Sequence, residues 1–293
     1  MRNNKLVLTV IQDQTTNTLT SALYIVAMPI GNWEDLSNRA LNVLAHVNVI
    51  LAEDTRVSGQ ILKGYGLDTR LISLNAHSEV GKTPKVIEAL EQGQSLALIS
   101  DAGTPAISDP GRHLIETVAA GGYPVIPIPG PSALIAALSI SGLQASPSHF
   151  FGFLSSKSGA RDRELDNALS YQGTLIFYEA PHRIVDLAVR IDKKALGRKI
   201  VFARELTKLF EQVIRLEAGQ CQAWFESNPD RIRGEFVVLI GVSRDKVLSH
   251  DIDAERLLRI LARELPPSKV ASIASEITGI PRRMLYDQLT NLS

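Results

Sequence analysis

A carboxylate, three small residues and a proline directly follow a short apolar run near the middle of the chain. The run is Leu96–Ile99, and the residues after it read Ser-Asp-Ala-Gly-Thr-Pro (100–105). In an open α/β sheet, ligands bind just beyond the carboxyl ends of the strands. Gly103 lacks a Cβ, so its backbone can bend sharply and approach a bound molecule closely. The segment therefore predicts a ligand site, with an ordinary strand-to-helix turn as the simpler alternative.

A second aspartate and a proline stand further along the same segment. Asp109 suits the N-cap of a following helix, and Pro110 suits the first turn of that helix. The sequence thus predicts a helix that begins at residue 110.

Four other apolar runs in the first half of the chain end in a similar way. The segments after them are 29–32 (PIGN), 53–56 (EDTR), 75–79 (NAHSE) and 129–132 (PGPS). If these strands are parallel, their ends and Asp101 lie along one edge of a sheet and form one cleft. Taken alone, each has a simpler explanation, since Thr55 and Ser132 suit N-caps and Glu53 could pair with Arg56.

Apolar runs alternate with amphipathic segments from residue 22 to about residue 140. We expect strands over 23–28, 47–52, 70–74, 96–99 and 124–128, and helices over 37–46, 55–64, 84–92, 110–120 and 132–140. Nearly continuous apolar strands separated by helices are typical of a mostly parallel sheet that is covered on both faces. The sequence therefore predicts an α/β fold for this part of the chain.

A second α/β unit follows a segment, 141–149, that lacks periodicity and is rich in turn formers. We expect strands over 150–154, 174–179, 199–205, 212–216 and 235–242, and helices over 161–169, 181–191 and near 220–226. Polar side chains again follow the strands, including Glu179 and Arg183 after one strand and Arg204, Glu205 and Lys208 after another.

The end of the chain predicts three short helices, over 252–264, 268–277 and 281–292. Small residues at Ala271 and Ala274, a glycine turn and a basic third helix are typical of a helix-turn-helix unit. Such a unit would present Arg282, Arg283 and Tyr286 to nucleic acid. A packing element with solvated arginines is the alternative.

The length, the charge balance and the cysteine content of the chain limit the classes of protein to which it can belong. The 293 residues suffice for two domains and a small third one. Lysine plus arginine (31) balances aspartate plus glutamate (31), so nucleic-acid binding would have to rest on local basic clusters. Cys221 is the one cysteine, which excludes an intrachain disulfide and a cysteine metal cluster and suits a reducing cytoplasm. We find no histidine pair or carboxylate set with metal-ligand spacing.

The first residues predict a loose polar tail, because the short apolar stretch 6–11 is broken by Asp13 and a run of Gln, Thr and Asn. No apolar stretch approaches the roughly 18 residues that a membrane-spanning helix needs. We therefore expect a soluble, cytoplasmic protein without membrane contact. Its expected division is a tail (1–20), two α/β domains (21–143 and 144–245) and a helical domain (250–293).

Seven segments between residues 23 and 242 stand in the order that one known family shows: LYIVAMPIGN, LAEDTR, LISDAGTPAISDPG, PIPGPSALIAALS, TLIFYEAPHR, FARELTK and GEFVVLI. Together they resemble the ribosomal RNA small-subunit methyltransferase I family of the tetrapyrrole methylase superfamily, and the helical tail resembles the C-terminal domain of that family. The resemblance implies S-adenosylmethionine-dependent methylation of the 2′-hydroxyl of a cytidine, in the decoding centre of 16S ribosomal RNA in the small ribosomal subunit. It also implies a cofactor cleft between two α/β domains, and a homodimer.

The resemblance further implies which residues bind the cofactor. They would be Pro29, Asp101, Ala102, Gly103, Thr104, Ile107, Ser132 and Ala133 from the first domain, and Tyr178, Leu206, Glu235 and Phe236 from the second. The chain departs from the family pattern at Trp33, at Val57 and within 75–79. These departures concern the acceptor side of the cleft more than the cofactor side.

Methylation of a ribose hydroxyl needs aligned reactants and a base. Strand-end carboxylates are the candidate bases, and among Glu53, Asp54, Glu79 and Glu205 we prefer Glu53 and Glu205. Arg56 would steady the developing oxyanion. Phosphate contacts are expected from basic residues on several elements, namely Lys157, Arg161, Arg163, Arg204, Lys208, Arg282 and Arg283.

Two other functions stay open at this point. One keeps the cofactor and changes the acceptor to a tetrapyrrole or another small molecule, although the basic helical tail argues against it. The other is a non-catalytic regulator that binds nucleic acid through the tail and uses the α/β part as a sensor. The absence of GxxxxGK[ST] argues against a P-loop nucleotide enzyme.

Overall fold

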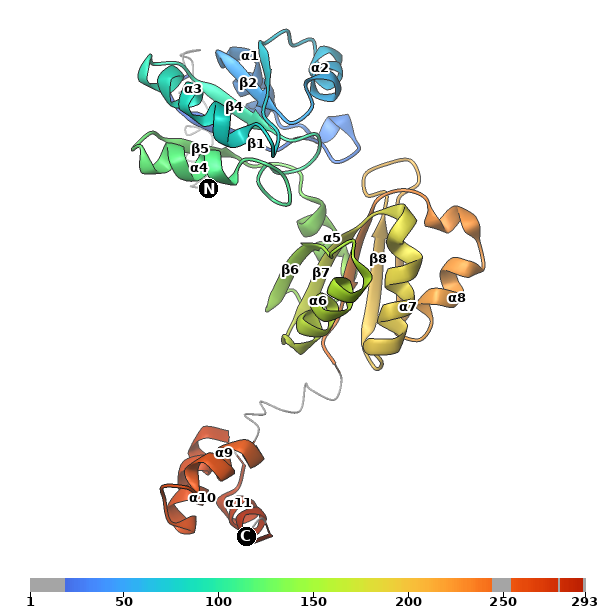
Figure 1. The fold of residues 1–293 in the computed structure, drawn as a ribbon. Helices are drawn as coiled ribbons and strands as arrows, with labels where there is room; N and C mark the ends of the chain where they lie inside the picture. Colours follow the sequence, from blue (N-terminus) through green and yellow to red (C-terminus); the bar gives the residue numbers. More distant parts are fainter. Residues whose placement is uncertain (1–18, 244–253, 279, 292–293) are drawn as a thin grey trace, which may run out of the picture.

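The first α/β domain is built on a fully parallel sheet of five strands (Figure 1). The computed structural model describes residues 19–243, 254–278 and 280–291 of the chain. The strands, in the order β3-β2-β4-β1-β5, are β1 (Leu23–Val26), β2 (Val49–Ala52), β3 (Leu71–Ser73), β4 (Leu96–Ile99) and β5 (Val125–Ile128). The predicted parallel sheet is therefore confirmed.

Helices cover both faces of this sheet: α1 (Asn38–His46) and α2 (Thr55–Gly64) on one face, and α3 (Glu79–Glu91) and α4 (Arg112–Ala120) on the other. Side chains alternate along each strand, so Ile50 packs towards α1 while Leu51 packs towards α3 and α4. Because both faces are covered, every residue of β2 and β4 is buried. A short 3-10 helix, η1 (Trp33–Asp35), joins β1 to α1.

Two helices of this domain start at positions that differ from the sequence prediction. Helix α4 begins at Arg112, after Gly111 with a φ of 129°, so the predicted start at residue 110 with Asp109 as N-cap is wrong. Helix α3 begins at Glu79 and holds Pro84 within it. The Glu79 carboxylate accepts the buried N–H of Leu114 at 2.9 Å, a tertiary contact that local sequence does not reveal.

The second sheet is mixed, with the order β6-β7-β10-β8-β9. Its strands are β6 (Ser148–Phe153), β7 (Thr174–Glu179), β8 (Lys199–Arg204), β9 (Gln212–Glu217) and β10 (Phe236–Ile240). β6 and β7 are parallel, whereas β10 runs antiparallel to both of its neighbours. The first residue of β10, Phe236, therefore pairs with the last residues of β7 and β8, Glu179 and Arg204. A strand start and two strand ends thus meet at one edge.

One face of the second sheet packs against α6 (Ser158–Ser170), α7 (Ile184–Lys194) and α8 (Cys221–Glu226), with the short helices η2 (Pro181–Arg183) and η3 (Pro229–Ile232). The other face is covered by α5 (Ala133–Ser141), whose Ala137 is fully buried beside Val201 and Val237. We expected α5 to belong to the first domain, but it packs on β8 and β10 of the second (Figure 1). The boundary at 143/144 stays a prediction.

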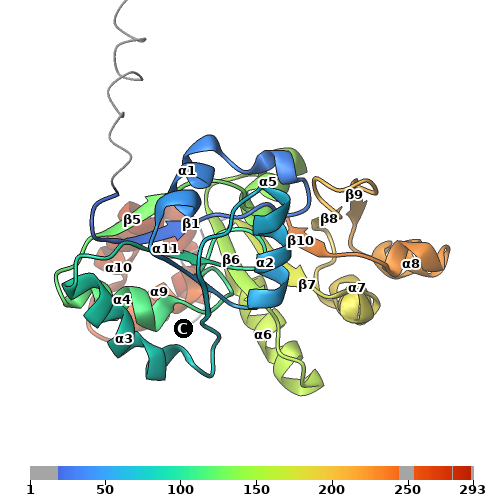
Figure 2. The same cartoon turned by 90° about the horizontal axis from the view of Figure 1, so that it is seen from above.

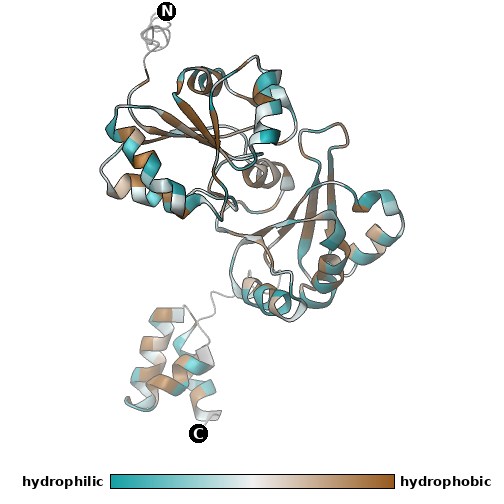
Figure 3. Cartoon of the chain, turned by 45° about the horizontal axis from the view of Figure 1, so that its top comes forward, coloured by the Kyte–Doolittle hydropathy of each residue, from teal (hydrophilic) through white to brown (hydrophobic). Residues whose placement is uncertain are grey.

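Seen from above, the second domain extends to one side of the first, with α8 at its outer end (Figure 2). Hydrophobic residues colour the strands of both sheets, whereas the helices alternate between hydrophobic and hydrophilic faces (Figure 3). This is the pattern that a covered sheet and amphipathic helices produce.

The C-terminal part consists of α9 (Ala254–Leu261), α10 (Pro267–Thr278) and α11 (Arg282–Asn291). These helices pack around Leu258, Val270 and Leu285, as the expected helix-turn-helix unit requires. The predicted start of the first helix at 252 and most of the predicted tail 1–20 lie outside the described residues. No helix within the described ranges has the length and apolar character needed to cross a membrane.

Candidate active site

A cavity of about 470 Å³ lies between the two α/β domains, at the carboxyl ends of β1, β2 and β4. The facing wall comes from the ends of β6, β7 and β8 and from the start of β10. Small-molecule sites typically have volumes of roughly 300–1,000 Å³, so this cavity has the size of a cofactor site. β1 and β4 are neighbours, and the helices that follow them, α1 and α4, lie on opposite faces of the sheet. Such a switch point is where open α/β sheets bind ligands.

All of the predicted cofactor residues except Pro29 line this cavity, namely Asp101, Ala102, Gly103, Thr104, Ile107, Ser132, Ala133, Tyr178, Leu206, Glu235 and Phe236. Pro29 is buried, and its neighbour Ile30 contributes to the wall instead. The structure thus brings together residues that are far apart in the sequence, while their role in binding stays a prediction.

The cavity also has lining residues that the sequence analysis did not assign to it, chiefly Ser108, Asp109, Phe153, Glu179, Ala180 and Pro181. Glu179, Ala180 and Pro181 belong to the YEAPHR segment, and this motif is the sequence signal that could have placed them at the cavity. Asp109 resembled a helix cap, so local sequence pointed away from the cavity. Phe153 is 55% exposed, and only the fold reveals that it forms part of the wall.

The loops after β1 and β4 are joined at the cavity. The N–H of Met28 donates to the carbonyl of Gly103 at 2.8 Å, and the N–H of Gly103 donates to the carbonyl of Met28 at 3.0 Å. Gly103 has a φ of 72°, a left-handed conformation that glycine adopts without steric cost. The hydroxyl of Thr104 donates to the carbonyl of Pro131 at 3.2 Å, which also fixes the segment before α5.

The two domains contact each other beside the cavity as well. The Asn32 N–H donates to the hydroxyl of Thr207 at 3.0 Å. Ser108 packs so closely on Gly152 of β6 that a Cβ at Gly152 would lie 3.0 Å from its hydroxyl oxygen. Ser132 precedes α5 without capping it through its side chain, so that side chain is left to the cavity.

Three carboxylates from the first domain line the cavity: Glu53 after β2, and Asp101 and Asp109 after β4. Burial, together with the charges of Asp101 and Asp54, raises the pKa of Glu53 above its ordinary value. Burial also raises the pKa of Asp109 to about 6, with further contributions from Glu53 and Asp101. The charge of Asp101 thus raises the pKa of both Glu53 and Asp109, and the cavity favours a positively charged or hydrogen-donating ligand.

Arg56 does not belong to this group. The pair between Glu53 and Arg56 that was the simpler alternative does not form, because Arg56 binds the Asp54 carboxylate at 2.7 Å. Asp54 also caps α2 by accepting the Arg56 N–H at 2.8 Å, so Thr55 is not the cap. The Arg56 side chain is 88% exposed and is absent from the cavity wall.

Glu205, our other preferred base, also lies outside the cavity wall. Its Oε1 accepts the N–H of Glu235 at 2.9 Å and the ammonium of Lys208 at 3.0 Å. Burial opposes ionisation of Glu205, but these donors lower its pKa. Lys208 also binds Oε2 of Glu235 at 2.8 Å. Glu205 and Lys208 therefore hold Glu235 at the edge of the cavity, and their side chains are occupied by that task.

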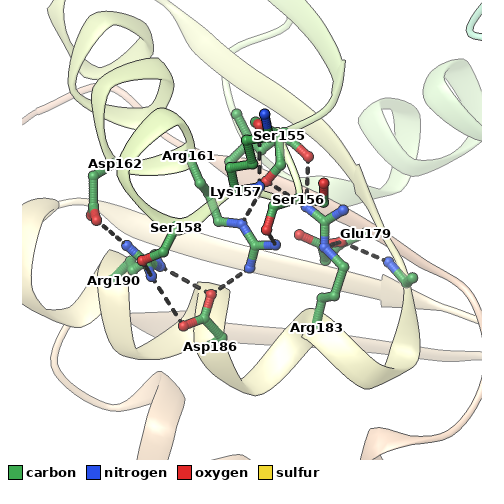
Figure 4. Close-up of polar contacts among 12 residues, drawn as sticks. Ser155, Ser156, Lys157, Ser158, Arg161, Asp162, Glu179, Arg183, Asp186 and Arg190 are labelled. Atoms are coloured by element: carbon green, nitrogen blue, oxygen red, sulfur yellow. Dashed lines mark hydrogen bonds and ion pairs between the residues drawn. The ribbon is translucent and has the colours of Figure 1, made fainter.

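Arg161 has a structural role that the sequence did not predict. It is 5% exposed, forms an ion pair with Asp186, and donates to the carbonyl of Ser155 at 2.9 Å (Figure 4). Arg183 binds the carboxylate of Glu179 at 3.0 Å and also donates to the carbonyl of Leu154. Arg161 and Arg183 thus fix the loop between β6 and α6, and the buried Arg161 is not available to RNA.

The other predicted RNA-binding residues differ in their accessibility. Lys157 and Arg163 are exposed at the start of α6, and Arg282 and Arg283 are exposed at the start of α11. Arg204 instead donates to the carbonyls of Asp230 and Arg233, which shapes the segment before β10. Within the described parts of the chain, no group of histidine, cysteine and carboxylate side chains could hold a metal ion.

Comparisons with known proteins agree with this architecture. The family model of the tetrapyrrole (corrin/porphyrin) methylases matches residues 22–222, and that of the RsmI C-terminal HTH domain matches residues 249–293. Solved structures with the same fold include a diphthine synthase, with a TM-score of 0.59, 14% identity, and 76% of this chain and 90% of that chain covered. Another is the uroporphyrin-III C-methyltransferase of Thermus thermophilus complexed with S-adenosyl homocysteine, with a TM-score of 0.53, 16% identity, and 75% and 97% covered.

Curated relatives match nearly the whole chain. The ribosomal RNA small subunit methyltransferase I of Pasteurella multocida is 42% identical, covering 92% of this chain and 97% of its own length. The proteins of the same name from Xylella fastidiosa (44% identical, covering 90% and 97%) and Escherichia coli O157:H7 (41% identical, covering 94% and 96%) are similar to the same extent. With the inter-domain cavity and the helical C-terminal unit, these matches show that the chain belongs to the ribosomal RNA small subunit methyltransferase I family of the tetrapyrrole methylases.

Proposed function

We propose that this enzyme uses S-adenosylmethionine to methylate the 2′-hydroxyl of a cytidine in the decoding centre of 16S ribosomal RNA. The observation that carries the proposal is the inter-domain cavity, whose wall holds the family's strand-end motifs from both domains. The relatives' names support RNA of the small ribosomal subunit as the substrate class. The nucleotide and the atom that is methylated follow from the family resemblance.

The residues around the cavity fit S-adenosylmethionine chemically. When bound, this cofactor supplies an activated methyl group on a positively charged sulfur. Asp101 can accept hydrogen bonds from amino or hydroxyl groups, and the carboxylates of Glu53 and Asp109 make the site favourable for positive charge. Gly103 and Ala133 leave room for close approach, and Phe236 provides apolar contact area.

The chain's own contribution to catalysis is mainly to position and to shield the reactants. Two domains that enclose a cavity hold donor and acceptor in one geometry and exclude water from them. A general base contributes typically about 10²–10⁴-fold in rate. Because Glu205 is held by Glu235 and Lys208, Glu53 is the one of our two preferred candidates whose side chain lines the cavity.

RNA would be held by exposed basic residues outside the cavity. Lys157 and Arg163 lie at the start of α6, whereas Arg282 and Arg283 lie on α11 of the helical domain. Contacts with phosphates from separate elements suit a long RNA footprint. Replacement of Arg282 and Arg283 by alanine is expected to weaken RNA binding and to reduce the dependence of binding on salt concentration.

A homodimer and a cytoplasmic location complete the proposal. Helix α5 consists of apolar residues except for Ser139 and Ser141, and although Ala137 is buried, Ile135 and Ile140 remain 61% and 40% exposed. An apolar helix face exposed in this way suits a contact with a second copy of the chain. Light scattering after size-exclusion chromatography is expected to give twice the mass of the chain, and Ile135→Glu is expected to reduce it to the mass of the monomer.

The function can be tested directly on ribosomal subunits. Small subunits from cells that lack this gene are incubated with the protein and S-adenosylmethionine, and the digested RNA is analysed by mass spectrometry. We expect one additional 2′-O-methylcytidine per subunit. Methylation of a tetrapyrrole precursor in place of RNA would identify the small-molecule alternative. Tight cofactor binding without methyl transfer to any RNA would instead support a regulator.

The cofactor site has its own test. Asp101→Asn keeps the shape of the side chain but removes its charge, and we expect it to weaken S-adenosylmethionine binding about tenfold or more in calorimetry. Asp68→Asn changes an exposed carboxylate of the same domain outside this cavity and serves as the control. Equal affinities for the two variants would remove Asp101 from the site.

A further inference from the structure

Asp109 is a carboxylate of the cavity that the sequence assigned to a helix cap. It lies in the loop between β4 and α4, and α4 begins after Gly111 without using its side chain. The Asp109 side chain is partly buried and contributes to the cavity wall with Asp101 from the same loop. The loop therefore presents this carboxylate to the site between the domains.

The backbone of this loop has unusual geometry on both sides of the aspartate. Ala106 and Ser108 have φ values of 64° and 68°, which is uncommon for residues other than glycine, and Gly111 follows with a φ of 129°. Ser108 also packs closely against Gly152 of β6 in the second domain. The segment that carries Asp109 thus lies where the two domains meet.

Asp109 also lies near the facing wall of the cavity, because its neighbour Ser108 packs against Gly152 of β6. The negative charge of Asp109 contributes to the raised pKa of Tyr178 of β7, although burial raises that pKa more. Glu53 is influenced by burial and by Asp101 and Asp54, all on its own side of the cavity. Asp109 therefore lies on the part of the first-domain wall that meets the second domain.

We propose that Asp109 is the general base that takes the proton from the acceptor hydroxyl, an inference that rests on the function proposed above. The O–H bond breaks and its proton moves to the Asp109 carboxylate, the oxygen lone pair forms the bond to the methyl carbon, and the electron pair of the carbon–sulfur bond remains on sulfur. Charge balances, because the sulfonium becomes a neutral thioether as the carboxylate becomes a neutral acid.

The ionisation of Asp109 suits this task. A base acts best when its pKa lies near the working pH, and the pKa of Asp109 is raised to about 6 by burial and by Glu53 and Asp101. The acid is thus ionised at neutral pH but holds a proton more readily than an exposed aspartate. The titratable groups that share the cavity wall are Glu53, Asp101, Tyr178, Glu179 and Glu235.

The other carboxylates are less suited to this role. Glu205 is bound to the Glu235 N–H and to Lys208 and lies outside the wall. Glu179 is 2% exposed, with one oxygen held by the Ala180 N–H and Arg183. Glu53 is the carboxylate to compare with Asp109, because its side chain lines the same cavity.

The test compares Asp109→Asn, Asp109→Glu and Glu53→Gln with the wild-type enzyme, and Asp68→Asn is the control. Binding of S-adenosylhomocysteine is measured by calorimetry, and kcat for small subunits is measured between pH 5 and pH 9. Asp109→Asn is expected to lower kcat roughly 10²- to 10³-fold, and to change the Kd for S-adenosylhomocysteine less than threefold. Asp109→Glu is expected to restore part of kcat, because it restores a carboxylate.

The pH dependence of kcat distinguishes a catalytic role of Asp109 from a purely structural one, because a structural role would leave this dependence unchanged. Wild-type kcat is expected to fall as the pH drops through about 6, because protonated Asp109 cannot accept a proton. The residual kcat of Asp109→Asn is expected to lack this fall. Glu53→Gln removes a neighbouring negative charge, so it should lower the pKa of Asp109 and shift the midpoint of the fall to lower pH.

The outcomes separate this inference from the proposed function. If the wild-type enzyme methylates no RNA, the proposed function fails. If the wild-type enzyme is active and Asp109→Asn retains its kcat, or if Glu53→Gln alone abolishes kcat, the assignment of Asp109 is wrong. A loss of S-adenosylhomocysteine binding in Asp109→Asn equal to the loss of kcat would show that Asp109 binds the cofactor rather than acting as the base.

Discussion

The hydroxyl of Tyr178 accepts the backbone N–H of Leu134 at 3.2 Å, so a residue of β7 caps the first turn of α5. Ser132, which precedes the helix, does not cap it through its side chain. The segment that connects the two domains is therefore fastened to the second sheet at the edge of the cavity.

Tyr178→Phe removes only the hydroxyl and leaves the Leu134 N–H without this acceptor. We expect the free energy of unfolding to fall by about 1 kcal/mol, the usual net contribution of one hydrogen bond. Denaturant unfolding measures this change. Tyr171→Phe, at a residue that is 43% exposed, is the matched control. Equal effects of the two changes would mean that the cap does not stabilise the fold.

Gly103→Ala and Gly122→Ala form a matched pair, because both glycines have left-handed backbones, with φ values of 72° and 79°. Each change should cost roughly 1–2 kcal/mol of stability through backbone strain. Only Gly103 lines the cavity, so only its replacement is expected to weaken S-adenosylhomocysteine binding, by roughly tenfold or about 1.4 kcal/mol. If both variants bind the ligand like the wild type, the close approach at Gly103 does not occur.

Glu205→Gln retains an oxygen that can accept the Glu235 N–H, whereas Glu205→Ala removes it. We expect the alanine variant to lose about 1–3 kcal/mol of unfolding free energy and the glutamine variant to lose less. Because Glu205 lies outside the cavity wall, the glutamine variant should keep most of its kcat. A complete loss of kcat in both variants, with ligand binding intact, would restore Glu205 as the base.

Arg161 and Arg163 are two residues apart, yet the structure gives them different tasks. Arg161→Ala is expected to lower the free energy of unfolding by about 1–3 kcal/mol, because the Ser155 carbonyl and Asp186 lose a buried partner. Arg163 is exposed, so Arg163→Ala should change stability by no more than about 0.5 kcal/mol while weakening RNA binding. If Arg163→Ala lowered the free energy of unfolding more than Arg161→Ala does, the structural role of Arg161 would be wrong.

Stability should depend on pH through Asp109. Its pKa is raised from 3.8 to about 6 in the folded protein, so the folded state binds the proton more tightly than the unfolded state does. The stability associated with this group is present below pH 3.8 and is lost as the pH rises through about 6. Asp109→Asn cannot ionise, so it should raise Tm relative to the wild type at pH 8 but not at pH 4. The same difference in Tm between the variant and the wild type at pH 4 and at pH 8 would contradict the raised pKa of Asp109.

Local sequence patterns suffice to locate most of the strands and helices and the motifs at their ends. The predicted bounds of α2, β4 and β7 coincide with the observed ones, because strong apolar periodicity and adjacent turn formers define both ends locally. Asp101 and Tyr178 could be placed at strand ends for the same reason. That they face one another across a cavity followed from the expectation of a parallel first sheet and from the family resemblance.

What each polar side chain binds depends on how segments distant in the sequence pack together. Asp109, Glu205 and Arg161 stand in segments that look alike locally, yet one lines the cavity, one holds Glu235 and one is buried against Asp186. Likewise, α5 packs on the second sheet although it follows the last strand of the first. Periodicity states which face of an element is apolar, but the partner of that face, and of each charge, depends on residues distant in the chain.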